Sequence, residues 1–205
     1  MIAVLLILIP FLSGLAGFFI RAEKGAKNWA VLSSLITAAV AFFALSQPAS
    51  QLNYDVSWLP TLGSRFALHM DGMSKMLVLL TAVAMPLIFI STIKNHYSNA
   101  GNFYGLMLLT QAGLMGVFLA SDLLLFYFFW ELALIPAYFL CSGWGGERRI
   151  AVTFKFFIYT FTGSLLMLIG ILYSAGYSKV ISINTGPTAS MTRISSASGA
   201  EACAR

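Results

Sequence analysis

The stretch Asp122-Leu-Leu-Leu-Phe-Tyr-Phe-Phe-Trp-Glu-Leu-Ala-Leu-Ile-Pro-Ala-Tyr-Phe-Leu140 decides the fold class of this sequence. It is apolar and close to the length of about 20 residues that a helix needs to cross a bilayer. One carboxylate, Glu131, lies in its middle. An unpaired charge at the bilayer centre costs about 3 kcal/mol or more, so the presence of this glutamate requires an explanation.

The composition of the whole chain agrees with a membrane protein. Of 205 residues, 59% are hydrophobic and 9% are charged, whereas about a quarter of a soluble domain is charged. The apolar runs do not alternate as the strands of a β-barrel would. We therefore expect an all-α, polytopic membrane bundle of about six transmembrane helices, over 2–20, 29–45, 73–93, 103–120, 123–142 and 154–174.

Several other classes of protein are disfavoured by the same sequence. The net charge is +5, but no basic face indicates nucleic-acid binding. Cys141 and Cys203 form neither a disulfide framework nor a metal-binding pattern. His69 and His96 lie far apart along the chain, so a metal site built from them is not expected. No phosphate-binding loop or nucleophile elbow is present.

The basic residues predict the orientation of the bundle. They concentrate in the first, third and fifth connections, at Arg21, Lys24, Lys27, Lys94, Arg148 and Arg149. The second and fourth connections carry Arg65, with Lys75 adjoining. The positive-inside rule then places the first, third and fifth connections in the cytoplasm and the N-terminus outside. In mitochondria the positive side would be the matrix.

The chain changes character after Tyr173. Residues 174–205 are rich in Ser, Thr, Ala and Gly and have no helical or strand period. We therefore divide the chain into a membrane domain, 1–173, and a polar tail, 174–205, which we expect to be disordered. Such a tail on an apolar chain also suggests a truncated or frame-shifted product.

Glu131 is the main candidate for a functional residue. Burial favours its neutral acid and a nearby cation would favour its carboxylate, so a balance between the two allows proton uptake and release. The alternative is a structural glutamate paired with a neighbouring hydroxyl or amide. Pro136 frees the carbonyl of Leu132, which could hold water or open a kink beside Glu131; proline is also simply tolerated in membrane helices.

Lys155 is the second candidate, at the start of the sixth predicted helix. It could belong to a proton path from the cytoplasm, or it could extend its ammonium to the lipid headgroups. Asp122 follows a tight turn and is expected to cap the fifth helix. Other polar residues within the predicted helices could line a wet path or bond between helices: Thr81, Thr110, Gln111, Tyr127, Tyr159, Thr160 and Thr162.

Short motifs around these residues resemble the antiporter-like subunits of respiratory complex I. They are Phe-Trp-Glu-x-x-x-x-Pro at 129–136, Ile-Pro-x-Tyr-Phe-Leu at 135–140, Gly-Trp-Gly at 143–145, Thr-Phe-Lys-Phe-Phe-Ile-Tyr at 153–159 and His-Met-Asp-Gly-Met-Ser at 69–74. The flanking residues look most like subunit M, the bacterial counterpart of mitochondrial chain 4. The resemblance covers roughly residues 1–173.

This resemblance implies a non-redox membrane-arm subunit of NADH-quinone oxidoreductase, an enzyme that couples proton translocation to quinone reduction. Glu131 would then be the glutamate that is essential for translocation, and it would interact with a lysine on a seventh helix. No cofactor is expected in this chain, since NADH, FMN, iron–sulfur clusters and quinone belong to partner subunits. The partners implied are the other membrane-arm subunits and the lipid bilayer. The membrane would be the bacterial inner membrane or, alternatively, the mitochondrial inner membrane.

Family members have about fourteen helices with two inverted five-helix repeats. Six helices would therefore make this sequence an N-terminal part only. The alternatives are a subunit of a multi-subunit sodium/proton antiporter or of a membrane-bound hydrogenase, or a fragment without function.

Overall fold

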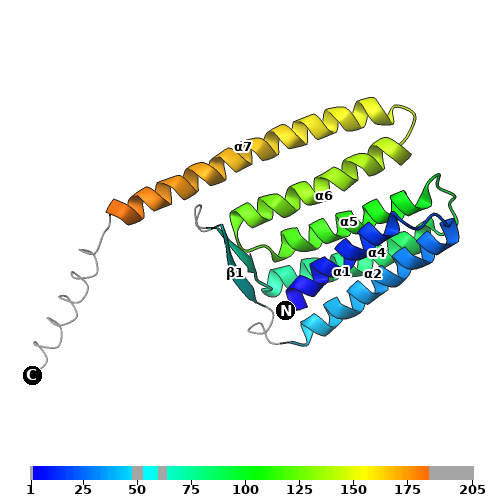
Figure 1. The fold of residues 1–205 in the computed structure, drawn as a ribbon, viewed down its shortest axis with the longest axis horizontal. Coiled ribbons are helices and arrows are strands. Elements are labelled where there is room, and N and C mark those ends of the chain that lie inside the picture. The colour runs from blue at the N-terminus through cyan, green and yellow to red at the C-terminus, as the bar shows by residue number, and fades with distance from the viewer. Residues whose placement is uncertain (1, 48–52, 60–63, 185–205) are drawn as a thin grey trace, which may run out of the picture. The chain divides into compact units, whose positions relative to one another are not determined.

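The structure is a computed structural model that describes residues 2–47, 53–59 and 64–184. Within these residues the chain forms helices and one β-hairpin, shown in Figure 1. In chain order the elements are α1 (Ile2–Gly17), α2 (Glu23–Leu45), β1 (Tyr54–Leu59), β2 (Ser64–Leu68), α4 (Gly72–Thr92), α5 (Ala100–Leu119), α6 (Leu123–Trp144) and α7 (Arg149–Asn184). The prediction of an all-α membrane bundle is confirmed.

Five of the described helices are long and apolar enough to cross a membrane, namely α2, α4, α5, α6 and residues 149–174 of α7. The first predicted span, 2–20, was too long. Helix α1 ends at Gly17, because the N–H groups of Phe18, Phe19 and Ile20 bond back three residues and form a turn. With 16 residues, α1 is about 24 Å long, less than the roughly 30 Å of a bilayer core.

The connection between α2 and α4 contains a β-hairpin that hydropathy did not predict. Strands β1 and β2 pair antiparallel, with Tyr54 opposite Leu68 and a register shift between Ser57 and Leu59. Strand β2 also continues its hydrogen bonding beyond the hairpin. The N–H of His69 donates to Leu119 O and the N–H of Ser121 donates to Ala67 O, both at 2.9 Å, so the hairpin is fixed to the α5–α6 turn.

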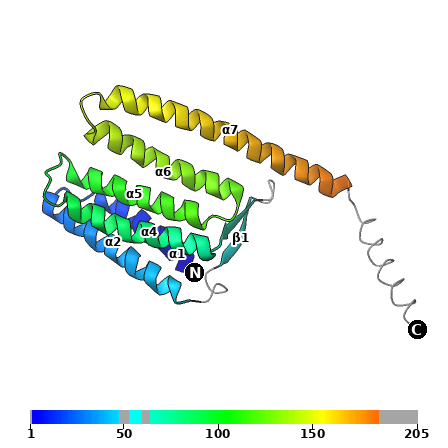
Figure 2. The ribbon, with the colours of Figure 1, turned by 180° about the vertical axis from the view of Figure 1, so that it is seen from behind.

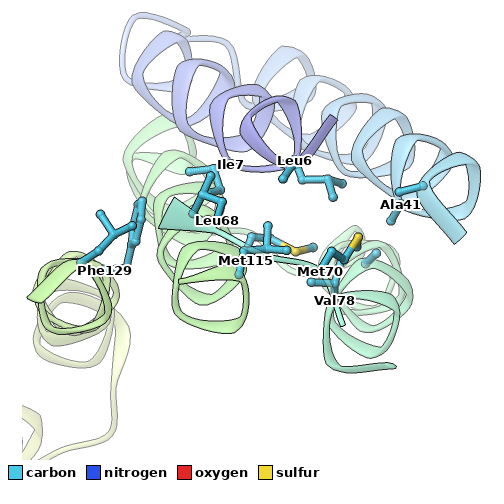
Figure 3. Close-up of a cluster of buried hydrophobic side chains, with 13 residues drawn as sticks. Leu6, Ile7, Ala41, Leu68, Met70, Val78, Met115 and Phe129 are labelled. Atoms are coloured by element: carbon cyan, nitrogen blue, oxygen red, sulfur yellow. The ribbon is translucent and has the colours of Figure 1, made fainter. Parts of the chain in front are cut away.

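A cluster of buried apolar side chains lies under this hairpin, as Figure 3 shows. It collects one or more residues from every neighbouring element: Leu6 and Ile7 from α1, Ala41 from α2, Leu68 from β2, Val78 from α4, Met115 from α5 and Phe129 from α6, together with Met70. In a membrane such side chains hold helices together by van der Waals packing. A second cluster around Phe89, Tyr104 and Leu108 joins α2, α4 and α5.

Glycines bring α5 close to α1 and to α6. A Cβ added to Gly14 of α1 would lie 3.0 Å from the carbonyl oxygen of Gly105 of α5. A Cβ added to Gly113 of α5 would lie 2.7 Å from the backbone of Ala133 of α6. Small residues at such contacts let membrane helices pack by van der Waals contact. Helix α5 is therefore the central element of the bundle.

The connections between helices alternate between two ends of the bundle in both views of the ribbon, Figures 1 and 2. At the end opposite the hairpin, Lys27 of α2 ties the first connection to the third. Its Nζ donates to the carbonyl oxygens of Ile93 (3.0 Å) and Asn95 (2.9 Å) and lies 2.8 Å from Oε1 of Glu23. His96 contacts the same carboxylate oxygen at 2.9 Å. The predicted positive connections therefore meet at one end.

Helix α7 is longer than the predicted span 154–174. It begins at Arg149 and continues through Asn184, so residues 174–184 of the predicted disordered tail are helical. The remainder of that tail, 185–205, lies outside the described residues. The chain divides into two compact units, one of residues 1–165 and one that begins at Leu166. The site described below lies in the first unit.

Candidate functional site

Helix α6 carries the candidate site and has two chemically different faces. Leu125 and Phe129 are buried in the core cluster, and Phe129 meets Phe66 of the hairpin edge-on, with ring centroids 6.4 Å apart. Glu131 is two residues further on, which turns its side chain by about 200° around the helix. The glutamate therefore points away from the core, toward α7.

Glu131 is half-buried and meets a buried serine of α7. The hydroxyl of Ser164 donates to Oε1 of Glu131 over 2.5 Å. Ser164 Oγ also lies 2.9 Å from the carbonyl oxygen of Phe161, one turn earlier in its own helix. The glutamate thus has a neutral polar partner, and within the described residues it forms no salt bridge.

A second contact between the same helices fixes their register. Tyr138 of α6 and Phe157 of α7 lie with ring centroids 4.8 Å apart. Tyr138 is seven residues after Glu131, and Phe157 is seven residues before Ser164. Both steps span about two helical turns, or 10 Å. The two helices are therefore antiparallel, and the Glu131–Ser164 contact belongs to a regular packing interface.

Tyr127 completes the polar face of α6. It lies four residues before Glu131, so both side chains are on the same side of the helix. Its phenol interacts with the carboxylate of Glu131 and with the hydroxyl of Ser164. Tyr127, Glu131 and Ser164 together form a cluster of two titratable groups and one hydroxyl, which we call the Glu131 cluster.

The structure does not bring Lys155 to Glu131. Lys155 is exposed and forms no salt bridge in the described part of the chain. It precedes Ser164 by nine residues, which corresponds to about 13 Å along α7 and half a turn around it. Its ammonium therefore lies on the face of α7 opposite the Glu131 cluster, and its part in a proton path stays a prediction.

The other polar helix residues differ in their surroundings, and Tyr159 and Thr162 are exposed. The hydroxyls of Thr81, Thr110 and Thr160 each donate to the carbonyl four residues back in their own helix, at 2.9–3.0 Å. Gln111 is fully buried, and its amide has no hydrogen-bond partner among the described residues. None of these hydroxyl bonds reaches the Glu131 cluster.

Asp122 caps α6, as predicted, and also holds the hairpin. Its Oδ1 accepts from the N–H groups of Leu124 (2.8 Å) and Leu125 (3.2 Å) and from the hydroxyl of Ser64 (3.0 Å). Its Oδ2 accepts from the N–H of Arg65. Burial raises the pKa of Asp122, but these donors favour the carboxylate, and the net pKa lies below its usual value. The carboxylate is therefore charged at neutral pH.

Sequence reasoning found Glu131 but missed Ser164. The signal was present in the sequence: Thr153, Phe157, Thr160 and Ser164 recur at the spacing of one helix face. This face contains the buried residues Thr153 and Ser164, whereas most of α7 around them is exposed. A serine is common in membrane helices, however, and only the packing of α7 on α6 shows which of its hydroxyls meets the carboxylate.

Comparison with known proteins finds similar sequences and a similar fold. Residues 120–198 match the model of the NADH:quinone oxidoreductase/Mrp antiporter transmembrane family. The F(420)H(2) dehydrogenase subunit M of Methanosarcina mazei is 40% identical over 175 residues, which are 83% of this chain and 35% of that protein. NADH-quinone oxidoreductase subunit M of Escherichia coli K12 is 36% identical over 187 residues, covering 82% of this chain and 36% of the relative.

A solved structure shows the same fold. A chain of respiratory complex I from Thermus thermophilus with bound NADH superimposes with a TM-score of 0.72 at 30% sequence identity, over 82% of this chain and 34% of that one. The chain spans about a third of the length of the relatives it matches. The family match runs past Tyr173, the predicted end of the resemblance.

These matches cover both helices of the Glu131 cluster, since α6 and α7 lie within residues 120–198. Together with the apolar helices they identify an integral, multi-pass membrane protein. Its relatives are subunits of respiratory enzyme complexes. By sequence and by fold, the chain is similar to members of the NADH:quinone oxidoreductase/Mrp antiporter transmembrane family.

Proposed function

We propose that this chain is part of subunit M of a proton-translocating quinone oxidoreductase, in which Glu131 takes up and releases protons within the membrane. The observation that carries the proposal is the placement of Glu131 in mid-helix, on the polar face of α6, against Ser164. Intramembrane carboxylates are expensive, and they mark ion and proton pathways in membrane proteins.

The similar proteins agree on the type of membrane subunit, but their names give different electron donors for the complex. One relative is named an F(420)H(2) dehydrogenase subunit, and others are named NADH- or NAD(P)H-quinone oxidoreductase subunits. We propose NADH-quinone oxidoreductase, with NADH, FMN, iron–sulfur clusters and quinone held by partner subunits of the complex. The chain would then contribute proton transfer and no redox group.

The proposed location is the bacterial inner membrane, with the N-terminus outside. This orientation follows from the basic connections at one end of the bundle. A mitochondrial inner membrane is the alternative. The proposed partners are the neighbouring membrane-arm subunits and the surrounding lipid.

The test is the substitution Glu131→Gln in a full-length subunit M that carries this region. Glutamine keeps the shape of the side chain and can still pair with a hydroxyl, but it cannot release and rebind a proton. Proton uptake into inverted membrane vesicles driven by NADH should fall by about 100-fold, the typical contribution of a proton-transfer group. Glu131→Asp should keep partial activity.

The matched control is Glu147→Gln, which removes an exposed carboxylate from the α6–α7 connection and should leave pumping unchanged. Native gels of both variants should show the assembled complex. Normal pumping by the Glu131→Gln complex would reject the relay, and loss of assembly in that variant alone would favour a structural glutamate.

A sodium/proton antiporter subunit is the second candidate, because the matching family model includes Mrp antiporters as well as NADH:quinone oxidoreductases. Vesicles with a sodium gradient and no NADH distinguish the two candidates. Sodium-driven proton movement that depends on Glu131 would favour the antiporter, whereas movement only in the presence of NADH favours the oxidoreductase.

A further inference from the structure

We propose that Ser164 is a positioning residue for Glu131, whose hydroxyl pairs with the glutamate side chain in both its charged and its neutral form. The inference deepens the proposed proton relay and rests on it. Its basis is the position of Ser164 Oγ, 2.5 Å from Oε1 of Glu131 and 2.9 Å from the carbonyl oxygen of Phe161.

A serine hydroxyl has one hydrogen and two lone pairs. Apart from the phenol of Tyr127, Ser164 Oγ has the oxygens of Glu131 and Phe161 within hydrogen-bonding distance, and both act as acceptors while Glu131 is ionised. The single hydrogen can serve only one of them at a time. With a carboxylate present it serves Glu131, because a bond to a charged acceptor is stronger than a bond to a neutral carbonyl.

Protonation of Glu131 reverses this arrangement. The acid now carries an O–H group, which donates to Ser164 Oγ, and the serine hydrogen rotates to the carbonyl oxygen of Phe161. The proton comes from the aqueous phase and returns to it when Glu131 ionises, so no other bond is made or broken. The glutamate oxygen keeps a partner at the same position in both states.

The surroundings make this hydroxyl the suitable partner. Ser164 is 5% exposed, so water does not readily replace it. The other titratable group that faces Glu131 is Tyr127 on the same helix, and no lysine, arginine or histidine pairs with Glu131 in the described residues. Without Ser164, the neutral acid would lose a fixed acceptor, and the carboxylate would lose a donor.

The experiment reads the Glu131 carboxyl directly, without turnover. The chain is placed in lipid nanodiscs, and infrared difference spectra are recorded between high and low pH. The carbonyl-stretch band of protonated Glu131 is identified by its loss in Glu131→Gln. In Ser164→Ala we expect this band at higher wavenumber, because the carboxyl has lost its hydrogen-bond partner.

Two further variants separate positioning from packing. Ser164→Thr restores the hydroxyl and should return the band to its original position. Thr160→Val removes a hydroxyl that lies one turn earlier in α7 and donates to Phe156 O, and it should leave the band unchanged. Circular dichroism confirms that each variant is folded. If Ser164→Ala does not fold, Ser164→Thr is compared with Ser164→Val, which lacks the hydroxyl. The inference then predicts the original band position in Ser164→Thr and a shifted band in Ser164→Val.

An unchanged band in folded Ser164→Ala, or an equal shift in Thr160→Val, would overturn the inference. The outcome is independent of the pumping assay. A shifted band together with normal pumping in the full-length Glu131→Gln complex would leave Ser164 as the partner of Glu131 and reject only the relay.

Discussion

Asp122 is the residue at which the hairpin, the α5–α6 turn and the start of α6 meet. Its Oδ1 serves the first turn of α6 and Ser64, and its Oδ2 accepts from the N–H of Arg65. The substitution Asp122→Asn keeps Oδ1 as a capping acceptor, since asparagine is a good N-cap. It replaces Oδ2 by an amide that cannot accept from Arg65, so we expect a loss of about 1 kcal/mol of stability at pH 7.

The pH dependence of this effect has a definite sign. Because hydrogen bonds outweigh burial and lower the pKa of folded Asp122, its stabilising contribution is complete above the unfolded pKa of about 3.9. It is lost as the pH falls through the lower folded value. Thermal unfolding of wild type and Asp122→Asn should therefore differ at pH 7 and converge toward pH 2. A difference that grows with acidity would contradict this account.

Asp71 provides the matched control at the residue scale. It is also an N-cap, of α4, and its carboxylate accepts from Ser74 N at 2.8 Å. Hydrogen bonds from the side chain and backbone of Ser74 lower its pKa as well. Among the described residues, no second segment bonds to the side chain of Asp71, so Asp71→Asn should change the unfolding temperature less than Asp122→Asn does.

Prediction from sequence worked best at single residues whose partners are local. The tight Ser121-Asp122 turn predicts a helix cap, which the structure confirms. The functional role of Glu131 stays a prediction. The bonds from Ser64 and Arg65 to Asp122 join residues nearly sixty positions apart. The Glu131–Ser164 pair likewise depends on how α6 and α7 are aligned with each other. This alignment cannot be predicted from the sequence of either helix alone.

At the scale of elements, the contact between α5 and α6 depends on the absence of a side chain at Gly113. A Cβ there would lie 2.7 Å from the Cα and the backbone N of Ala133, which are rigid parts of α6. Gly113→Ala must therefore separate the two helices or bend one of them. We expect a loss of about 1–3 kcal/mol, measured as a lower unfolding temperature in lipid nanodiscs.

Gly163→Ala is the control for this prediction. Gly163 lies in the interior of α7, and an added Cβ would meet nothing within 4 Å. Alanine is the better helix former, so this variant should gain up to about 1 kcal/mol. If Gly113→Ala were as stable as Gly163→Ala, the close packing of α5 on α6 would be wrong.

The helices were predictable because their apolar runs are visible in the hydropathy of the sequence. Each predicted span overlaps one helix, because a helix in lipid must satisfy its own backbone. The hairpin was missed, since Tyr54–Leu59 and Ser64–Leu68 are too short to stand out in a polar connection, and their pairing is stabilised by contacts with α5 and α6. The end of α7 was misplaced, because its residues beyond 174 are helical without being apolar.

At the scale of the whole molecule, the two ends of the bundle differ in charge and structure. One end carries the hairpin and the short α5–α6 turn, and the other carries the first, third and fifth connections (Figure 2). The latter end holds Lys27, Glu23 and His96 in one cluster of contacts and the exposed residues Arg148 and Arg149. The difference predicts how the protein inserts into a membrane.

The orientation is tested by single cysteines at the two ends. Val56 of the hairpin and Glu147 of the α6–α7 connection are both exposed, and neither is basic, so Val56→Cys and Glu147→Cys keep every residue that the positive-inside rule counts. The background is Cys141→Ser with Cys203→Ser, since Cys141 is itself exposed.

A membrane-impermeant maleimide should label Val56→Cys in right-side-out vesicles and Glu147→Cys only in inverted or permeabilised vesicles. The cysteine-free background should remain unlabelled in both preparations. Labelling of Glu147→Cys from outside would reverse the proposed orientation and would place the apolar N-terminal end of α1 in the cytoplasm. It would also require the basic end of the bundle to have crossed the membrane, against the charge bias that normally retains it.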